Sequence, residues 1–252
     1  MTSASVGFQC PECIQEGRAS VRAPRRTGAL RSSGRRWGPV TTGIIGVNVA
    51  VFIVTAVSAG LAGSSPLDNA ASPVWLALAQ APSLVQAGET WRVVTAAFLH
   101  VGPLHLVLNM LALLVFGSEI ERGIGRWRYA ALYAISLLGG AAAIQLFGEN
   151  RYVAGASGAI YGLLGAITVF LLFRRQDVRG ILTLLAINIV ISFLPGISLL
   201  GHLGGLVAGA AAAGVIVAFR RRPPLQAVGL AVLGAVLLLV AVTAPTVLVV
   251  GL

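Results

Sequence analysis

The chain has 252 residues, of which 57% are hydrophobic and only 10% charged, with a mean hydropathy of +0.89. Soluble domains carry about 25% charged residues, so this composition excludes an ordinary soluble globule. Runs of about 20 apolar residues are typical of transmembrane helices. Uninterrupted apolar runs also favour helices over barrel strands, in which apolar and polar residues alternate. We therefore expect an all-α membrane protein, a polytopic helical bundle.

The formal net charge is +10, from 18 basic and 8 acidic residues. Every basic residue is Arg, and almost all lie before or between the apolar runs. A soluble protein with such a charge would suggest a nucleic-acid partner. Here the distribution indicates membrane topology instead, so we expect the lipid bilayer, and no nucleic acid, as a partner.

In chain order, residues 1–39 form a polar tail with seven Arg and the motif Cys10-Pro11-Glu12-Cys13. Structural zinc needs four ligands, and the chain has no other Cys, so we predict no metal and leave Cys10 and Cys13 as a minor possibility. Cys10 and Cys13 then belong to a truncated zinc site, to a zinc site that two chains share, or to the remnant of a former zinc site.

Seven apolar runs follow the tail, and we predict seven transmembrane helices from them: 40–63, 103–117, 129–147, 155–173, 180–194, 201–219 and 225–244. The fifth is short for a span. The longest connection, 64–102, contains Trp75 and Trp91, which are typical of the membrane interface. We divide the chain into a cytoplasmic basic tail (1–39), a six-helix core (40–219) and a basic connection with a seventh helix (220–252).

The Arg residues alternate along the connections, with sixteen on the side of the tail and two on the other. The positive-inside rule then predicts a multi-pass protein of the cell membrane, with a cytoplasmic N-terminus and an outer C-terminus. The second, fourth and sixth helices all run from outside to inside. Their first turns therefore lie at one depth, and they carry the polar residues His105, Asn109, Ser157 and His202.

Polar residues at membrane depth indicate a functional site. A Ser hydroxyl needs an adjacent base to act as a nucleophile, and His is the usual one, so we predict Ser157 as nucleophile and His202 as general base. His105, Asn109 and the backbone N–H of Ser157 are the predicted oxyanion donors. No Asp or Glu lies at this depth, so we expect a dyad. Tyr161, one turn below Ser157, is expected to pack on the imidazole of His202.

Each residue also has an ordinary structural interpretation. A Ser at a helix start is commonly a cap, and a membrane His commonly hydrogen-bonds another helix. Glycines such as Gly155, Gly158 and Gly205 allow membrane helices to approach closely. Only the combination of these residues at one depth favours catalysis.

The combination resembles the rhomboid family of intramembrane serine proteases. The segment 155–162 resembles the GxSG motif of the family, and Gly201-His202-Leu203-Gly204-Gly205 resembles its catalytic-His helix. The H-x4-H-x3-N pattern and the Trp-Arg element of its first loop correspond to His100, His105, Asn109, Trp91 and Arg92. The resemblance covers about 40–219 and implies six helices, with a seventh in a subset of members.

The resemblance implies the same roles for Ser157, His202, His105, Asn109 and Tyr161, and suggests that His100 supports the first loop. It implies cleavage of single-span membrane proteins near the outer face, with no cofactor. The alternative is a non-catalytic rhomboid-like protein that binds membrane clients. Such proteins usually lack the Ser or the His, and this chain has both.

Overall fold

The computed structural model describes residues 2–3, 8–9, 37–148, 151–194 and 196–245. The chain divides into two units, Met1–Arg36 and Trp37–Leu252. In the first unit, strand β1 (Thr2–Ser3) pairs antiparallel with β2 (Phe8–Gln9). Cys10, Cys13 and the seven Arg of the tail lie outside the described residues. The prediction for this segment therefore stays a prediction.

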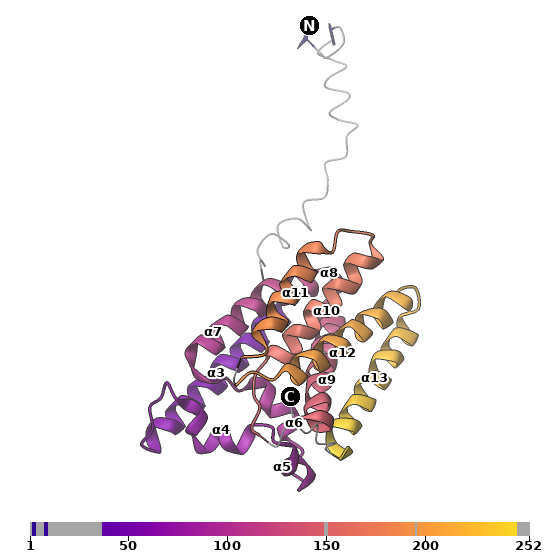
Figure 1. Ribbon diagram of the computed structural model, residues 1–252. Coiled ribbons are helices and arrows are strands. Elements are labelled where there is room, and N and C mark those ends of the chain that lie inside the picture. The colour runs from indigo at the N-terminus through magenta and orange to yellow at the C-terminus, as the bar shows by residue number, and fades with distance from the viewer. Residues whose placement is uncertain (1, 4–7, 10–36, 149–150, 195, 246–252) are drawn as a thin grey trace. The chain divides into compact units, whose positions relative to one another are not determined.

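The second unit is a helical bundle, which confirms a polytopic helical membrane protein (Figure 1). Its main helices are α3 (Pro39–Leu61), α7 (Gly102–Ala112), α8 (Ser118–Ile124), α9 (Arg126–Phe147), α10 (Ser157–Phe173), α11 (Arg179–Ile191), α12 (Leu199–Ala218) and α13 (Pro223–Thr243). The connection after α3 contains η1 (Asn69–Ala71), α4 (Pro73–Leu78), α5 (Pro82–Gln86), α6 (Arg92–Thr95) and η2 (Ala96–Phe98).

Among the described residues, five helical segments are long and apolar enough to cross a membrane: Pro39–Leu61, Gly102–Ile124, Arg126–Phe147, Leu199–Ala218 and Pro223–Thr243. Two further apolar helices are shorter, α10 with 17 residues and α11 with 13. Both coincide with runs in which the sequence predicts spans. Their length places them near or below the about 17 residues that a perpendicular span requires.

The second apolar helix is longer than the sequence predicts. The expected end at residue 117 is wrong, because α7 continues through a π-helical segment η3 (Leu113–Gly117) into α8, which ends at Ile124. In this last part Glu119 pairs with Arg122 one turn away, and Glu121 is buried. The helix ends where Gly125 adopts a φ of 87°, a conformation that favours glycine.

Close packing of α10 against α12, and of both against α9, forms the centre of the bundle. Glycines allow this approach. A Cβ atom added to Gly205 would overlap the carbonyl oxygen of Gly158, and one added to Gly209 would overlap that of Gly162. Backbones in contact bring the first turns of α10 and α12 together, and these turns carry Ser157 and His202.

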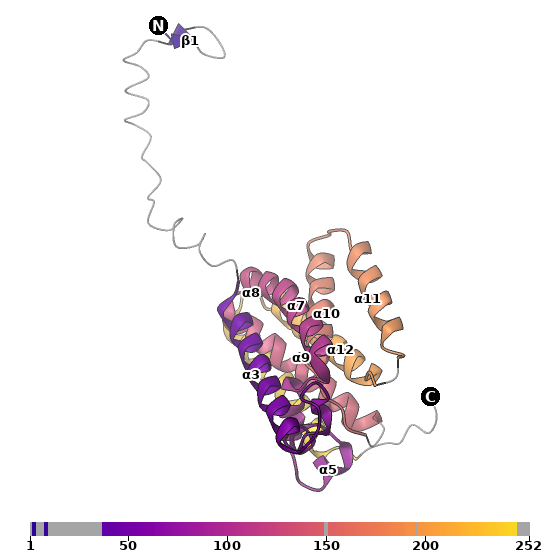
Figure 2. The same ribbon diagram turned by 90° about the vertical axis from the view of Figure 1, so that its left-hand side faces the viewer.

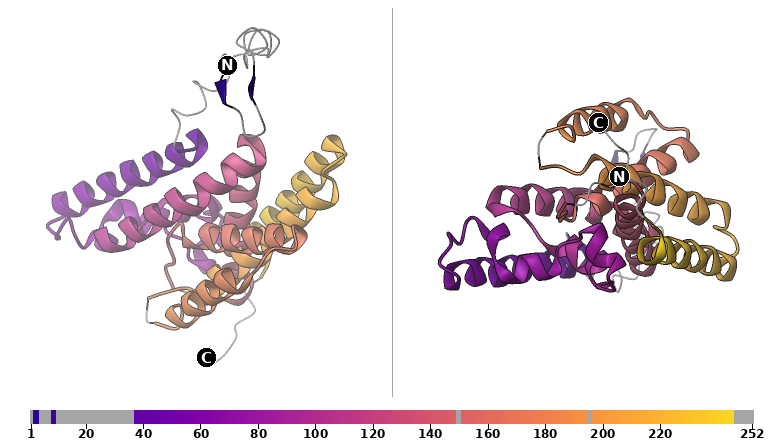
Figure 3. Two further views of the ribbon diagram at one scale, coloured as in Figure 1. Left: turned by 90° about the horizontal axis from the view of Figure 1, so that it is seen from above. Right: turned by 60° about the horizontal axis from the view of Figure 1, so that its bottom comes forward.

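The edges of the bundle are formed by α3 on one side and α13 on the other (Figures 1 and 3). Helix α13 packs mainly against α9. Buried Gln226 attaches it to the core, because its amide nitrogen donates to the Ile216 carbonyl (2.7 Å) and its amide oxygen accepts from Arg128 Nε (2.6 Å). Helix α11 lies at the edge opposite α3 in the view of Figure 2.

Candidate active site

Ser157 and His202 meet at one end of the bundle. Ser157 is the first residue of α10, and His202 lies in the first turn of α12, where Ser198 caps the Gly201 N–H. The Ser157 Oγ atom lies 2.8 Å from His202 Nε2, within hydrogen-bonding distance. His202 is buried and Ser157 partly exposed. The two groups are separated by 45 residues in the chain and are in the geometry of a nucleophile and its base.

Two contacts hold the imidazole of His202 on its other sides. The ring of Tyr161 stacks on it, with centroids 4.0 Å apart and an interplanar angle of 11°. The hydroxyl of Ser192 lies 2.7 Å from Nδ1. Sequence reasoning missed Ser192, which directly follows α11 and lies on a segment that the motifs do not include. The ring therefore contacts side chains from both neighbouring helices.

His105 faces the loop before Ser157. Its Nδ1 accepts a hydrogen bond from the Val101 N–H at 3.2 Å, so the neutral ring carries its proton on Nε2. A Cβ atom on Gly155 would lie about 3.1 Å from that Nε2 and 3.4 Å from Ser157 Oγ. Gly155, with a φ of 137°, thus provides both the backbone conformation and the space that lets the His105 nitrogen approach Ser157.

Asn109 lies one turn further along α7 on the face of His105. It is buried, and its amide nitrogen donates to the His105 carbonyl at 2.8 Å. The first turn of α10 adds backbone donors, because the N–H groups of a helix start have no intrahelical partner. His105, Asn109 and the backbone N–H of Ser157 are the predicted oxyanion donors, and their role stays a prediction.

His100 packs behind His105. It is completely buried, and its ring lies edge-on to that of His105, with centroids 5.0 Å apart. Burial, and secondly the proximity of His105, lowers the pKa of His100 from 6.5 to about 3. His100 is therefore neutral at physiological pH and adds no charge beside His105. Its backbone carbonyl accepts from the amide of buried Asn69, which ties this turn to the connection after α3.

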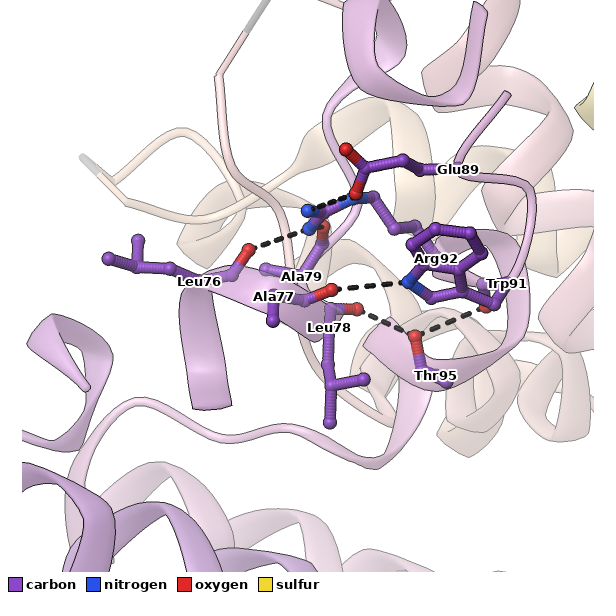
Figure 4. Close-up of polar contacts among 8 residues, drawn as sticks. All are labelled: Leu76, Ala77, Leu78, Ala79, Glu89, Trp91, Arg92 and Thr95. Atoms are coloured by element: carbon purple, nitrogen blue, oxygen red, sulfur yellow. Dashed lines mark hydrogen bonds and ion pairs between the residues drawn. The ribbon is translucent and has the colours of Figure 1, made fainter. Parts of the chain in front are cut away.

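Arg92 braces the long connection between α3 and α7 (Figure 4). Its buried guanidinium donates to the carbonyl oxygens of Leu76 (2.6 Å) and Ala79 (2.7 Å) and pairs with Glu89. Trp91, which is half exposed, donates from its indole N–H to the Ala77 carbonyl at 3.2 Å. Both predicted residues of this element thus hold one turn of the connection together, and they lie outside the contacts of Ser157 and His202.

The turn that Arg92 holds is linked by backbone hydrogen bonds to the segment before Ser157. Gln80 follows Ala79 and pairs with Val153 through two backbone hydrogen bonds, of 3.0 and 2.8 Å. Two residues later, the Gly155 N–H donates to the Ala96 carbonyl at 2.9 Å. The connection therefore fixes the backbone that leads into Ser157, which gives the Trp-Arg element a positioning effect through the backbone.

A small cavity of about 40 Å³ lies among the sequence neighbours of Ser157. Its lining includes Gly155, Gly158 and Gly201, together with Gln80 and Val153. These glycines flank Ser157 and His202 in the sequence, but neither Ser157 nor His202 lines the cavity. Among the described residues, no group of three or more His, Cys, Asp or Glu side chains is arranged to hold a metal ion.

Comparisons with a family model and with known proteins point to the same family. Residues 87–219 match the family described as Rhomboid domain. The chain is 37% identical over 133 residues to RHOMBOID-like protein 6, mitochondrial, of Arabidopsis thaliana, covering 50% of this chain and 43% of that protein. It is 37% identical over 163 residues to Rhomboid protease GluP of Bacillus subtilis, covering 62% of this chain and 31% of that protein.

The matched part thus spans less than half the length of either relative. It includes each predicted site residue outside the tail, from Trp91 to Gly205. The family match covers more than half of the chain. The multi-pass helical bundle, with its polar cluster at the helix starts, agrees with that match. The chain belongs to the rhomboid family.

Proposed function

We propose that this chain is an intramembrane serine endopeptidase in which Ser157 is the nucleophile and His202 the general base. The observation that carries the proposal is the 2.8 Å separation between Ser157 Oγ and His202 Nε2. A Ser hydroxyl reacts with a carbonyl only when a neighbouring base takes its proton. In this membrane-embedded site, His202 is the base within hydrogen-bonding distance.

In the proposed reaction, Ser157 Oγ attacks the carbonyl carbon of the scissile peptide while its proton passes to His202 Nε2. The carbonyl oxygen becomes an oxyanion in the tetrahedral intermediate. As the C–N bond breaks, the imidazolium returns that proton to the leaving amine, and an acyl ester on Ser157 remains. Water, deprotonated by His202, then hydrolyses the ester and regenerates the free enzyme.

The oxyanion forms beside Ser157, where donors are already directed. His105 presents its protonated Nε2 toward Gly155, and the first-turn N–H groups of α10 point along the helix axis. Asn109 completes the site from the same face of α7. Loss of one such donor typically lowers kcat by about 10²–10³.

The proposed substrates are single-span membrane proteins, cut near the outer face. A transmembrane helix hides its carbonyl groups in hydrogen bonds, so the substrate must unwind locally before Ser157 can reach one. Helix-weakening Gly or Pro residues near the cut favour this step. The cavity of about 40 Å³ that Gly155 and Gly158 help to line supports a small side chain at the cleaved position.

The test uses the purified chain in detergent and a single-span reporter with a helix-weakened segment. Cleavage is expected with the native chain and is expected to vanish with Ser157→Ala and with His202→Ala. A fluorophosphonate, which reacts with activated serines, should label the native chain at Ser157. Ser136→Ala is the control, because Ser136 is also buried but donates only to the Leu132 carbonyl within its own helix.

Cleavage that survives Ser157→Ala would overturn the proposal. Absence of both cleavage and labelling in the native chain, across several reporters, would instead favour the client-binding alternative. In that case, binding of the reporter without cleavage is the expected observation.

A further inference from the structure

The hydroxyl of Ser192 has three polar neighbours. It lies 2.8 Å from the Asn188 carbonyl oxygen, 2.8 Å from the Tyr161 hydroxyl and 2.7 Å from His202 Nδ1. Ser192 is 2% exposed, so water does not compete for these bonds. A buried hydroxyl with three partners has a determined proton arrangement, because it carries one proton and two lone pairs.

The Asn188 carbonyl cannot donate, so the Ser192 proton must point to it. Both lone pairs of Ser192 then accept, one from the Tyr161 O–H and one from His202 Nδ1–H. This assignment satisfies all three contacts at once. It places the proton of the neutral imidazole on Nδ1 and leaves Nε2 bare.

A bare Nε2 is what the general base requires, because Nε2 faces Ser157 at 2.8 Å. We infer that Ser192 is a positioning residue of the proposed protease: it fixes the tautomer and orientation of His202 so that Nε2 accepts the proton of Ser157. The inference rests on the proposed function. It replaces the expected two-residue dyad with a dyad that is oriented by a neutral third group.

The same hydrogen bond persists through the reaction. When Nε2 takes the Ser157 proton, Nδ1–H still donates to Ser192 Oγ, and no second proton moves. The neutral oxygen orients the imidazolium without receiving its charge. A carboxylate in this place would have to be buried in the bundle, which is costly in a membrane.

Ser192 also makes the base depend on the position of α11. Leu185 is the buried residue of that helix, whereas Leu182, Ile187 and Val190 are exposed (Figure 2 shows α11 at the edge of the bundle). The bonds of Ser192 to Tyr161 and His202 are therefore polar attachments of the end of α11 to the core. Displacement of this end would release the Nδ1 proton from its acceptor.

The first readout does not depend on activity. The chain has only three His, so ¹⁵N-histidine labelling gives three imidazole spin systems, and the His202→Gln variant assigns one of them. In the native chain at neutral pH we expect His202 with a protonated Nδ1 and a bare Nε2. In Ser192→Ala we expect both tautomers to be populated. A bare Nδ1 in the native chain overturns the inference.

The second readout is the rate. We expect Ser192→Ala to lower kcat for the reporter about tenfold, the loss of one neutral hydrogen bond, with KM little changed. Ser192→Thr keeps the hydroxyl and is expected to restore both the rate and the Nδ1–H tautomer. The control is Ser136→Ala, which removes an equally buried hydroxyl that bonds its own helix and should match the native chain.

These readouts separate the two proposals. A native chain that cleaves, with Ser192→Ala cleaving at the same rate and showing the same His202 spectrum, overturns the inference and leaves the protease proposal intact. The opposite result is a native chain that neither cleaves the reporter nor labels at Ser157, but has a protonated His202 Nδ1 that Ser192→Ala turns into a mixture of tautomers. That result overturns the protease proposal and retains the role of Ser192 in orienting the ring.

Discussion

Glu121 of α8 caps the start of α3 with its side chain. Its carboxylate accepts the N–H of Val40 (3.0 Å) and both the N–H and the hydroxyl of Thr41 (2.8 Å each). Gly38, the residue before α3, has no side chain to cap the helix, and any Cβ there would overlap this carboxylate. A buried anion at a helix start satisfies unpaired donors and complements the helix dipole.

We expect Glu121→Gln to lower the free energy of unfolding by about 2–3 kcal/mol, because an amide keeps one acceptor oxygen and turns a donor toward the N–H groups. Glu119→Gln is the matched control. Glu119 is exposed and pairs only on the surface with Arg122, so its loss should cost less than about 1 kcal/mol. Thermal unfolding in detergent measures both. Equal stability of the two variants would contradict the capping role.

At the residue scale, the sequence predicts those site residues whose side chains are typical of catalysis. Three His in a membrane protein are conspicuous, and topology alone placed Ser157, His105 and His202 at one depth. Ser192 gave no such signal, because a Ser in an apolar helix commonly bonds the carbonyl four residues earlier, and Ser192 does so too. Only the packing of α11 reveals that its lone pairs face Tyr161 and His202.

At the scale of elements, the packing of α10 on α12 determines whether Ser157 and His202 can meet. Gly158 and Gly205 lie at the contact, each near the start of its helix, close to Ser157 and His202. The added Cβ of Gly205 would overlap a backbone atom, which cannot rotate away as a side chain can. The two helices would have to separate near Ser157 and His202.

We therefore expect Gly205→Ala to destabilise the chain by about 1–3 kcal/mol, the usual cost of overpacking, and to slow fluorophosphonate labelling of Ser157. Gly214→Ala on the same helix is the control, since an added Cβ there meets nothing within 4 Å. It should be neutral or stabilising by up to about 1 kcal/mol, because Ala is the better helix former. Identical stability and labelling of the two variants would rule out the close contact as the determinant.

Helix ends were the part of each element that the sequence predicted least well. Apolar runs indicate where helices lie, but the predicted second helix ends at residue 117 and leaves out the segment from Ser118 to Ile124. Glu121 is tolerated inside that helix because its partners come from α3, some 80 residues away. Composition alone cannot show a partner so distant in the chain.

For the whole molecule, all described Arg residues except Arg92 and Arg151 gather at one end of the bundle. They lie at the junctions of α8 with α9, α10 with α11, and α12 with α13, toward the top of Figure 1. The connection with α4, α5 and α6 and the start of α10 lie at the other end. The division into a six-helix core and an added α13 stays a prediction, consistent with the packing of α13 mainly on α9.

The positive-inside rule assigns the Arg-rich end to the cytoplasm. Maleimide labelling of single cysteines can test this orientation in bacterial cells. The starting chain carries Cys10→Ser and Cys13→Ser, so that each added cysteine is the only thiol. Ser65→Cys, exposed in the connection after α3, should react with a membrane-impermeant maleimide on intact cells. Gly123→Cys, exposed near the end of α8, should react only after the cells are permeabilised. A permeant maleimide confirms that both thiols are reactive.

The same labelling experiment also shows on which side of the membrane Ser157 lies. The connection that carries Ser65 is paired through Gln80 with Val153, four residues before Ser157, so the labelled face is also the face at which Ser157 lies. Labelling of Ser65→Cys on intact cells would therefore place Ser157, and with it the proposed cleavage, in the outer half of the membrane. Labelling of Gly123→Cys instead would invert the topology and move the proposed cut to the cytoplasmic side, against the Arg distribution.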